Sequence, residues 1–138
     1  MDLNSFSVLI SVYKNDQPDF VCVALDSMLI HQSVIPNEIV LVQDGPVSAG
    51  LQTVIREYEE KYPFLMHVIR LEENGGLGNA LRIGVENAKY GIIARMDSDD
   101  ICHPDRFQKQ LFFLAEHPEC DIVGGQMTEF IGESINIF

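Results

Sequence analysis

Short apolar runs and amphipathic segments alternate along the chain, and their spacing predicts the elements of the fold. Runs rich in β-branched and aromatic residues predict strands at 6–13, 38–43, 65–71 and 91–96, with a further strand at 121–125. Between these runs, apolar residues recur at helical spacing. The repeating positions are Val21, Ala24, Leu25, Met28 and Leu29; Leu51, Val54, Ile55 and Tyr58; Leu77, Ala80, Leu81, Val85 and Ala88; and Phe107, Leu111 and Leu114. The last helix should begin near Pro104.

This alternation predicts an α/β fold: a three-layer αβα, Rossmann-like domain with a mainly parallel sheet. The run at 65–71 alternates between apolar and polar residues, so its strand should lie near an edge of the sheet. In parallel sheets, ligands bind outside the carboxyl ends of the strands. The residues expected there are Tyr13, Asp44, Asn74 and Asp97, and we expect them to converge on one crevice.

Three carboxylates follow the strand at 91–96, in the sequence Asp97-Ser98-Asp99-Asp100. Two carboxylates about 4 Å apart repel by roughly 1 kcal/mol in water and about 4 kcal/mol at an effective dielectric constant near 20. A divalent cation is the usual compensator, because hard cations take carboxylate oxygens as ligands. In an extended segment, Asp97 and Asp99 would point the same way. Asp100 would then face away, capping the next helix or pairing with Arg106. The alternative is a solvated acidic loop.

An EF-hand calcium loop is excluded, because Cys102 and Gln108 stand where that loop needs glycine and glutamate. The glycine-rich stretch 74–80 precedes a predicted helix and could approach a phosphate, or it could be only a turn. Asp44 could likewise end a tight turn or accept N–H groups of a base. Tyr13 could stack on a base or close the core.

Composition narrows the classes of partner. The 138 residues carry a net charge of −12 and no basic run, which argues against binding of nucleic acid or of an anionic membrane surface. No apolar run is long enough to span a bilayer, and the dispersed cysteines fit reduced thiols in the cytoplasm. The apolar end at Phe138 suggests the front part of a longer protein, which could be peripheral at the inner membrane.

The ordered motifs resemble the family 2 glycosyltransferases, whose nucleotide-binding half has a GT-A fold. The resemblance covers nearly the whole chain and rests on stretches 7–15, 38–45 and 74–78 with Gly84, and on Ala94-Arg95-Met96-Asp97-Ser98-Asp99-Asp100, which is similar to the DXD signature. With Arg106, Phe107, Lys109 and Gln110, the set looks closest to bacterial enzymes of lipopolysaccharide and exopolysaccharide assembly.

The resemblance implies transfer of a sugar from a nucleotide diphosphate sugar, with uracil the commonest base, to a saccharide or lipid-linked saccharide acceptor. It implies Mn²⁺ or Mg²⁺ as cofactor, with Asp97 and Asp99 at the metal. Asp97 would also contact the ribose, Asp44 the base and Tyr13 the face of the base. The implied nucleotide-sugar-binding residues are Ser11, Tyr13, Asp44, Asn74, Gly78, Arg82, Asp97 and Ser98. The reaction would be inverting, and its general base, an acid, has no counterpart before Phe138. We therefore expect residues 1–138 to be the nucleotide-sugar-binding part alone.

The chain departs from the family pattern at two places. Gln43 precedes Asp44 where a second acid is common, and Leu81-Arg82 stands where Arg-Asn is common. Two other functions remain as alternatives. A sugar nucleotidyltransferase would need a glycine-rich loop after the first strand, and residues 13–18 contain no glycine. A non-catalytic nucleotide-sugar-binding module would use the same crevice without transfer.

Overall fold

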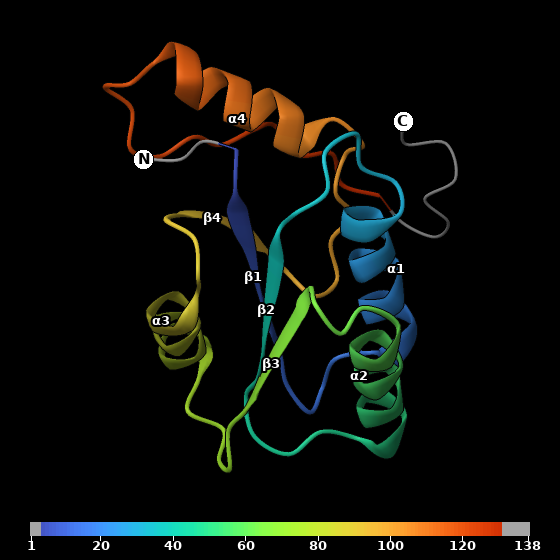
Figure 1. Cartoon of the computed structure of the whole chain (residues 1–138). Helices are drawn as coiled ribbons and strands as arrows, with labels where there is room; N and C mark the ends of the chain where they lie inside the picture. The colour runs from blue at the N-terminus through green and yellow to red at the C-terminus, as the bar shows by residue number, and fades with distance from the viewer. Residues whose placement is uncertain (1–3, 131–138) are drawn as a thin grey trace.

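The structure of the chain is a computed structural model that describes residues 4–130. Four parallel strands form one sheet in the order β3-β2-β1-β4 (Figure 1). The strands are β1 (Phe6–Val12), β2 (Glu38–Gln43), β3 (Met66–Arg70) and β4 (Ile92–Met96), and the helices are α1 (Pro18–Leu29), α2 (Ala49–Lys61), α3 (Leu77–Asn87) and α4 (Arg106–Glu116). The predicted α/β fold with a parallel sheet is confirmed.

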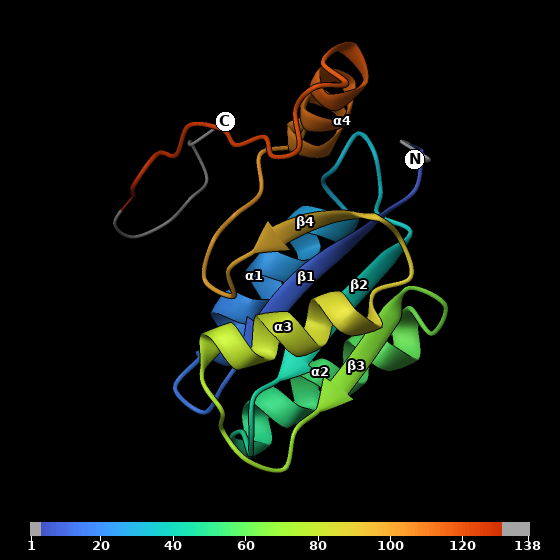
Figure 2. The same ribbon diagram turned by 90° about the vertical axis from the view of Figure 1, so that its left-hand side faces the viewer.

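The helices make the outer layers of the fold. Figures 1 and 2 show α1 and α2 on one face of the sheet and α3 on the other. Phe6, Val8 and Ile10 of β1 belong to the core shared with α1 and α2, whereas Leu9 packs in a second core with Ala80 of α3. Because both faces are covered, β1 and β2 are almost continuously buried, as the unbroken apolar runs predict.

Close packing holds α3 against the centre of the sheet. A Cβ atom on Gly84 would lie 2.2 Å from Cδ1 of Leu9 and 3.2 Å from Cγ2 of Val42, so the helix axis can approach the strands only with glycine there. The amino end of α3 is thereby held at the carboxyl end of the sheet. Helix α4 lies at the opposite end, where its Phe107 ring meets Phe6 at 5.0 Å between centroids.

The predicted elements agree with the structure to within about two residues, with one exception. Strand β3 lies at an edge, as its alternating pattern indicates. The predicted strand at 121–125 is wrong: in residues 4–130 no strand pairs with this run, and Ile122 is 89 % exposed. An apolar run becomes a strand only where a neighbouring strand satisfies its N–H and C=O groups. Within the same residues, no helix is both long and apolar enough to cross a membrane.

Two expectations for the acidic segment are also wrong. Residues 98 and 99 form a turn and not an extended segment, with the Asp100 N–H donating to the Asp97 carbonyl at 3.3 Å. Asp100 does not cap α4, which begins after Asp105. No ion pair joins Asp100 to Arg106 in the described part of the chain, since the guanidinium donates to the Arg95 carbonyl at 2.9 Å.

Candidate functional site

A crevice of about 500 Å³ lies at the carboxyl ends of the strands. The four strand-end residues that the pattern singled out all line it, from four separate loops. Six of the eight expected nucleotide-sugar-binding residues and both expected metal ligands form part of its wall: Ser11, Tyr13, Asp44, Asn74, Asp97, Ser98 and Asp99. Residues distant in the sequence therefore meet at one place, as expected for a parallel sheet.

Asp44 connects the end of β2 to the glycine-rich loop before α3. Its carboxylate is buried, with Oδ1 accepting from the Gly75 N–H at 2.8 Å and Oδ2 from the Gly76 N–H at 3.1 Å. The Asn74 amide donates to the Asp44 carbonyl at 3.2 Å. Each carboxylate oxygen still has a second lone pair. Asp44 thus holds the loop, and its oxygens can accept a further donor from the crevice.

Gly45 makes this connection possible. Its φ of +85° is rare for residues with a side chain, and a Cβ there would lie 2.6 Å from the Asn74 backbone nitrogen. The chain after β2 and the chain after β3 therefore touch through their backbones. Gly76, the residue before α3, has a φ of +92° and offers no side-chain cap to the helix. The first N–H groups of α3 are consequently left for another acceptor.

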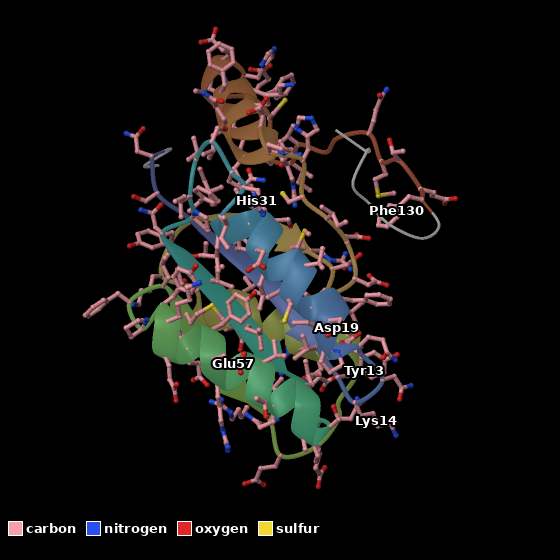
Figure 3. The ribbon with its side chains drawn as sticks, turned by 90° about the vertical axis from the view of Figure 1, so that its right-hand side faces the viewer. Tyr13, Lys14, Asp19, His31, Glu57 and Phe130 are labelled. Atoms are coloured by element: carbon pink, nitrogen blue, oxygen red, sulfur yellow. The ribbon has the colours of Figure 1, made fainter. Side chains whose placement is uncertain are left out.

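Tyr13 stands at the end of β1. Its side chain is 40 % exposed, so the ring does not close either hydrophobic core. Figure 3 shows Tyr13 with Lys14 and Asp19 at one end of α1 and His31 at the other. An exposed aromatic ring at the rim of a crevice can stack on a planar ligand.

The acidic turn after β4 contrasts with Asp44. Asp97 and Asp99 are exposed, and the closest basic group to Asp97 is the Arg95 guanidinium at 3.6 Å. Partial desolvation, together with the charges of Asp97 and Asp99, raises the pKa of the Asp100 carboxyl. The charges of Asp97 and Asp99 therefore act on the Asp100 carboxyl in the folded chain.

The donor set fits a cation that binds together with a second ligand. No group of three or more His, Cys, Asp or Glu side chains converges to hold a metal within residues 4–130. Asp97 and Asp99 supply oxygen atoms to the crevice, which suits Mg²⁺ or Mn²⁺. Mg²⁺ is commonly held by one or two carboxylates together with substrate phosphates. Two exposed carboxylates beside a free helix amino end match that pattern.

Asp16 is a crevice residue that the sequence did not reveal. Its Oδ2 accepts from the Tyr13 N–H at 2.9 Å, and its Oδ1 accepts from the Ser98 hydroxyl at 2.9 Å. An aspartate shortly after a strand commonly closes a turn, which is the only signal available in the sequence. The contact with Ser98 joins residues 82 positions apart and has no local signature.

Two expected binding residues lie outside the crevice wall. Gly78 is in the first turn of α3, where only its backbone N–H could reach a ligand. Arg82 pairs with Glu86 at 2.9 Å and donates to Asn79 at 3.0 Å, along the exposed side of α3. Gln43, which replaces the common acid, is buried outside the crevice, and its amide donates to the Gly45 carbonyl at 3.3 Å.

A smaller cavity, of about 290 Å³, lies at the opposite end of the sheet beside Glu38 and His67. Burial would raise the pKa of Glu38, but hydrogen bonds from the Lys89 N–H, the Ser7 hydroxyl and His67 outweigh it, so the pKa is lowered. Both Glu38 oxygens are thereby engaged, which makes this cluster a structural link between strands.

Comparison with known proteins agrees with the geometry. The family model of Glycosyl transferase family 2 matches residues 7–137. The amylovoran biosynthesis glycosyltransferase AmsE of Erwinia amylovora is 43% identical over 125 residues, which cover 91% of this chain and 46% of that protein. The UDP-Gal:alpha-D-GlcNAc-diphosphoundecaprenol beta-1,3-galactosyltransferase of Escherichia coli is 35% identical over 132 residues, covering 94% of this chain and 46% of that protein.

A solved structure has the same arrangement of elements. S. aureus TarS 1-349 in complex with UDP superposes with a TM-score of 0.69 and 25% sequence identity, covering 83% of this chain and 33% of that chain. The chain therefore belongs to glycosyl transferase family 2, and its domain has the GT-A fold. It spans about half the length of the curated relatives that it matches.

Proposed function

We propose that this chain is the nucleotide-sugar-binding part of an enzyme that transfers a sugar from a UDP-sugar to an acceptor hydroxyl in bacterial polysaccharide assembly. The acceptor would be a saccharide or a lipid-linked saccharide. The names of the amylovoran and galactosyltransferase relatives and the UDP complex of TarS support this choice of donor and pathway class. The observation that carries the proposal is the crevice, where two exposed carboxylates face a glycine loop and a free helix amino end.

The two sides of the crevice suit the two ends of such a donor. The first N–H groups of α3 favour a phosphate, because they lack partners and sit at the positive end of the helix dipole. Tyr13 would stack on the base, and Asp44 would accept an N–H from it while still holding the loop. Ser11 and Asn74 would complete the polar wall around the nucleoside.

Asp97 and Asp99 would hold Mn²⁺ or Mg²⁺ beside the diphosphate. When bound, the cation neutralises the charge that develops on the departing diphosphate. Without it, two carboxylates and a diphosphate would repel one another across the crevice. In this arrangement Asp99 serves the metal, and Asp97 serves both the metal and the ribose.

The proton of the acceptor hydroxyl needs a general base. We place that base, and the acceptor-binding part, outside residues 1–138, in keeping with relatives about twice as long as this chain. Residues 1–138 alone should then bind the donor and fail to transfer the sugar. Sugar transfer by residues 1–138 alone would contradict the placement of the general base outside these residues.

Titration calorimetry with UDP, with and without MnCl₂, tests the donor site. For the wild-type chain we expect Mn²⁺ to raise UDP affinity by at least about tenfold, which is about 1.4 kcal/mol. Asp99→Ala should abolish that increase. Asp19→Ala is the matched control, because it removes an exposed acid from the first turn of α1 outside the crevice. UDP binding that neither Mn²⁺ nor Asp99→Ala changes would overturn the assignment of the acidic turn.

A further inference from the structure

The acidic turn 97–100 is tied to the rest of the crevice by a single side-chain hydrogen bond among the described residues. The Ser98 hydroxyl donates to Asp16 Oδ1 at 2.9 Å, and the side chains of Asp99 and Asp100 make no hydrogen bond or ion pair in the same part of the chain. Ser98 lies between the two expected metal ligands. Whatever holds Ser98 therefore also determines where Asp97 and Asp99 can place their oxygens.

Asp16 is itself held firmly at the end of β1. Its backbone N–H donates to the Tyr13 carbonyl at 3.1 Å, and its Oδ2 accepts the Tyr13 N–H at 2.9 Å. These two bonds close a turn that continues directly from the buried strand β1. The carboxylate is thus a fixed acceptor presented to the loop after β4. A hydrogen bond to an ionised acceptor is stronger than one between neutral groups.

We propose that Asp16 is a positioning residue of the donor site, which acts through the Ser98 hydroxyl to set the placement of Asp97 and Asp99 around the cation. This inference rests on the proposed function, because it assigns Asp16 a purpose only if the turn binds a metal with UDP. Asp16 is not itself a ligand of the cation. No third acid converges with Asp97 and Asp99 in residues 4–130, so Asp16 is not placed to complete a metal site with them.

A double-mutant cycle tests the link. Asp16→Ala, Ser98→Ala and the double variant are titrated with UDP, each with and without MnCl₂, and thermal unfolding is followed in parallel. We expect each single variant to lower the Mn²⁺-dependent UDP affinity by about three- to tenfold, the range for one hydrogen bond. The double variant should lose no more than either single one, because both substitutions remove the same bond.

Two conservative variants and one control sharpen the result. Ser98→Thr keeps a hydroxyl, so its Mn²⁺-dependent UDP affinity should stay close to that of the wild type. Asp16→Asn keeps only a neutral acceptor, so its affinity should lie between those of the wild type and Asp16→Ala. The midpoint of thermal unfolding of the Ser98 variants should stay close to that of the wild type, which a general loss of structure would not allow. Asp19→Ala should behave as the wild type, since Asp19 does not line the crevice.

Several outcomes would overturn the inference. A loss in Asp16→Ala without a loss in Ser98→Ala would make Asp16 a direct ligand. Losses that add in the double variant would show two independent roles. Unchanged affinity in both single variants, with normal wild-type binding, would remove the positioning role and leave the donor site standing. Absence of Mn²⁺-dependent UDP binding in the wild type would instead refute the proposed function, and the positioning role with it.

Discussion

The two sides of the crevice use the same kind of side chain in opposite ways. On one side Asp44 is 3 % exposed, and both of its oxygens accept backbone N–H groups of the glycine loop. On the other side Asp97 and Asp99 are exposed, and Arg95 stands 3.6 Å from Asp97. The Asp44 carboxylate is engaged by the fold through one N–H on each oxygen, whereas the carboxylates of Asp97 and Asp99 are left for solvent or a ligand.

This difference indicates how the site divides its tasks. A buried carboxylate must have hydrogen-bond partners, so Asp44 stabilises the fold and presets the glycine loop before any ligand arrives. Exposed carboxylates need no internal partner and keep their lone pairs, and Arg95 beside Asp97 and the charge of Arg106 near Asp100 offset their repulsion only in part. We therefore propose that the side assigned to the nucleotide is formed by folding, and that the side assigned to the metal is completed by binding.

The largest expected effect comes from Gly45→Ala, on the preset side. The new Cβ would sit 2.6 Å from the Asn74 nitrogen, on a backbone with φ of +85°. Overpacking and a left-handed backbone together should lower the free energy of unfolding by about 2–4 kcal/mol. Urea denaturation measures this loss in the free energy of unfolding. The control Gly91→Ala meets open space and should stay within about 0.5 kcal/mol; a similarly small loss at Gly45 would mean that the two loops are not tightly packed.

One substitution made on both sides sharpens the comparison. Asp44→Asn turns a buried NH₂ group toward the N–H of Gly75 or Gly76, so that two donors face each other without an acceptor. We expect a loss of about 1–3 kcal/mol in the free energy of unfolding. Asp99→Asn breaks no hydrogen bond of the described chain and should change stability by less than about 0.5 kcal/mol. Equal losses in urea denaturation would contradict the contrast between the two sides.

Much of the frame of the site could be predicted from the sequence. Strand runs buried on both faces are continuous in apolar residues, as at β2, and parallel strands bring their carboxyl ends together. That reasoning places Tyr13, Asp44, Asn74 and Asp97 on one crevice without knowledge of any side-chain contact.

What the sequence could not predict depends on contacts between distant segments. The Ser98–Asp16 bond spans 82 residues, and the engagement of Asp44 by the glycine loop spans 31 and 32. The run at 121–125 has the composition of a strand, but pairing depends on a neighbouring strand that composition does not reveal. The turn at 98–99 likewise replaces the extended segment that spacing alone suggested.

The smallest expected effect concerns pH and the open side. Partial desolvation and the charges of Asp97 and Asp99 raise the pKa of Asp100 above its ordinary 3.8. The folded chain then binds this proton more tightly than the unfolded chain does. The contribution of Asp100 to the free energy of unfolding therefore falls as pH rises from about 3.8 through the raised pKa. At lower pH, where Asp100 is protonated in both states, it does not destabilise the folded chain. Asp99→Asn removes one of the charges and should make this fall shallower.

The effect should stay below about 0.5 kcal/mol and shrink further in salt, because exposed charges are screened. Glu38 acts with the opposite sign. Its lowered pKa supports folding above the ordinary 4.5, and that support is lost as pH falls through the folded-state pKa. The free energy of unfolding of the wild type and of Asp99→Asn is measured by urea denaturation from about pH 3 to about pH 7. Because Glu38 contributes equally to both proteins, the difference between their curves contains only the pH dependence of the acidic turn. If that difference did not depend on pH, the charge of Asp99 would not contribute to the raised pKa of Asp100.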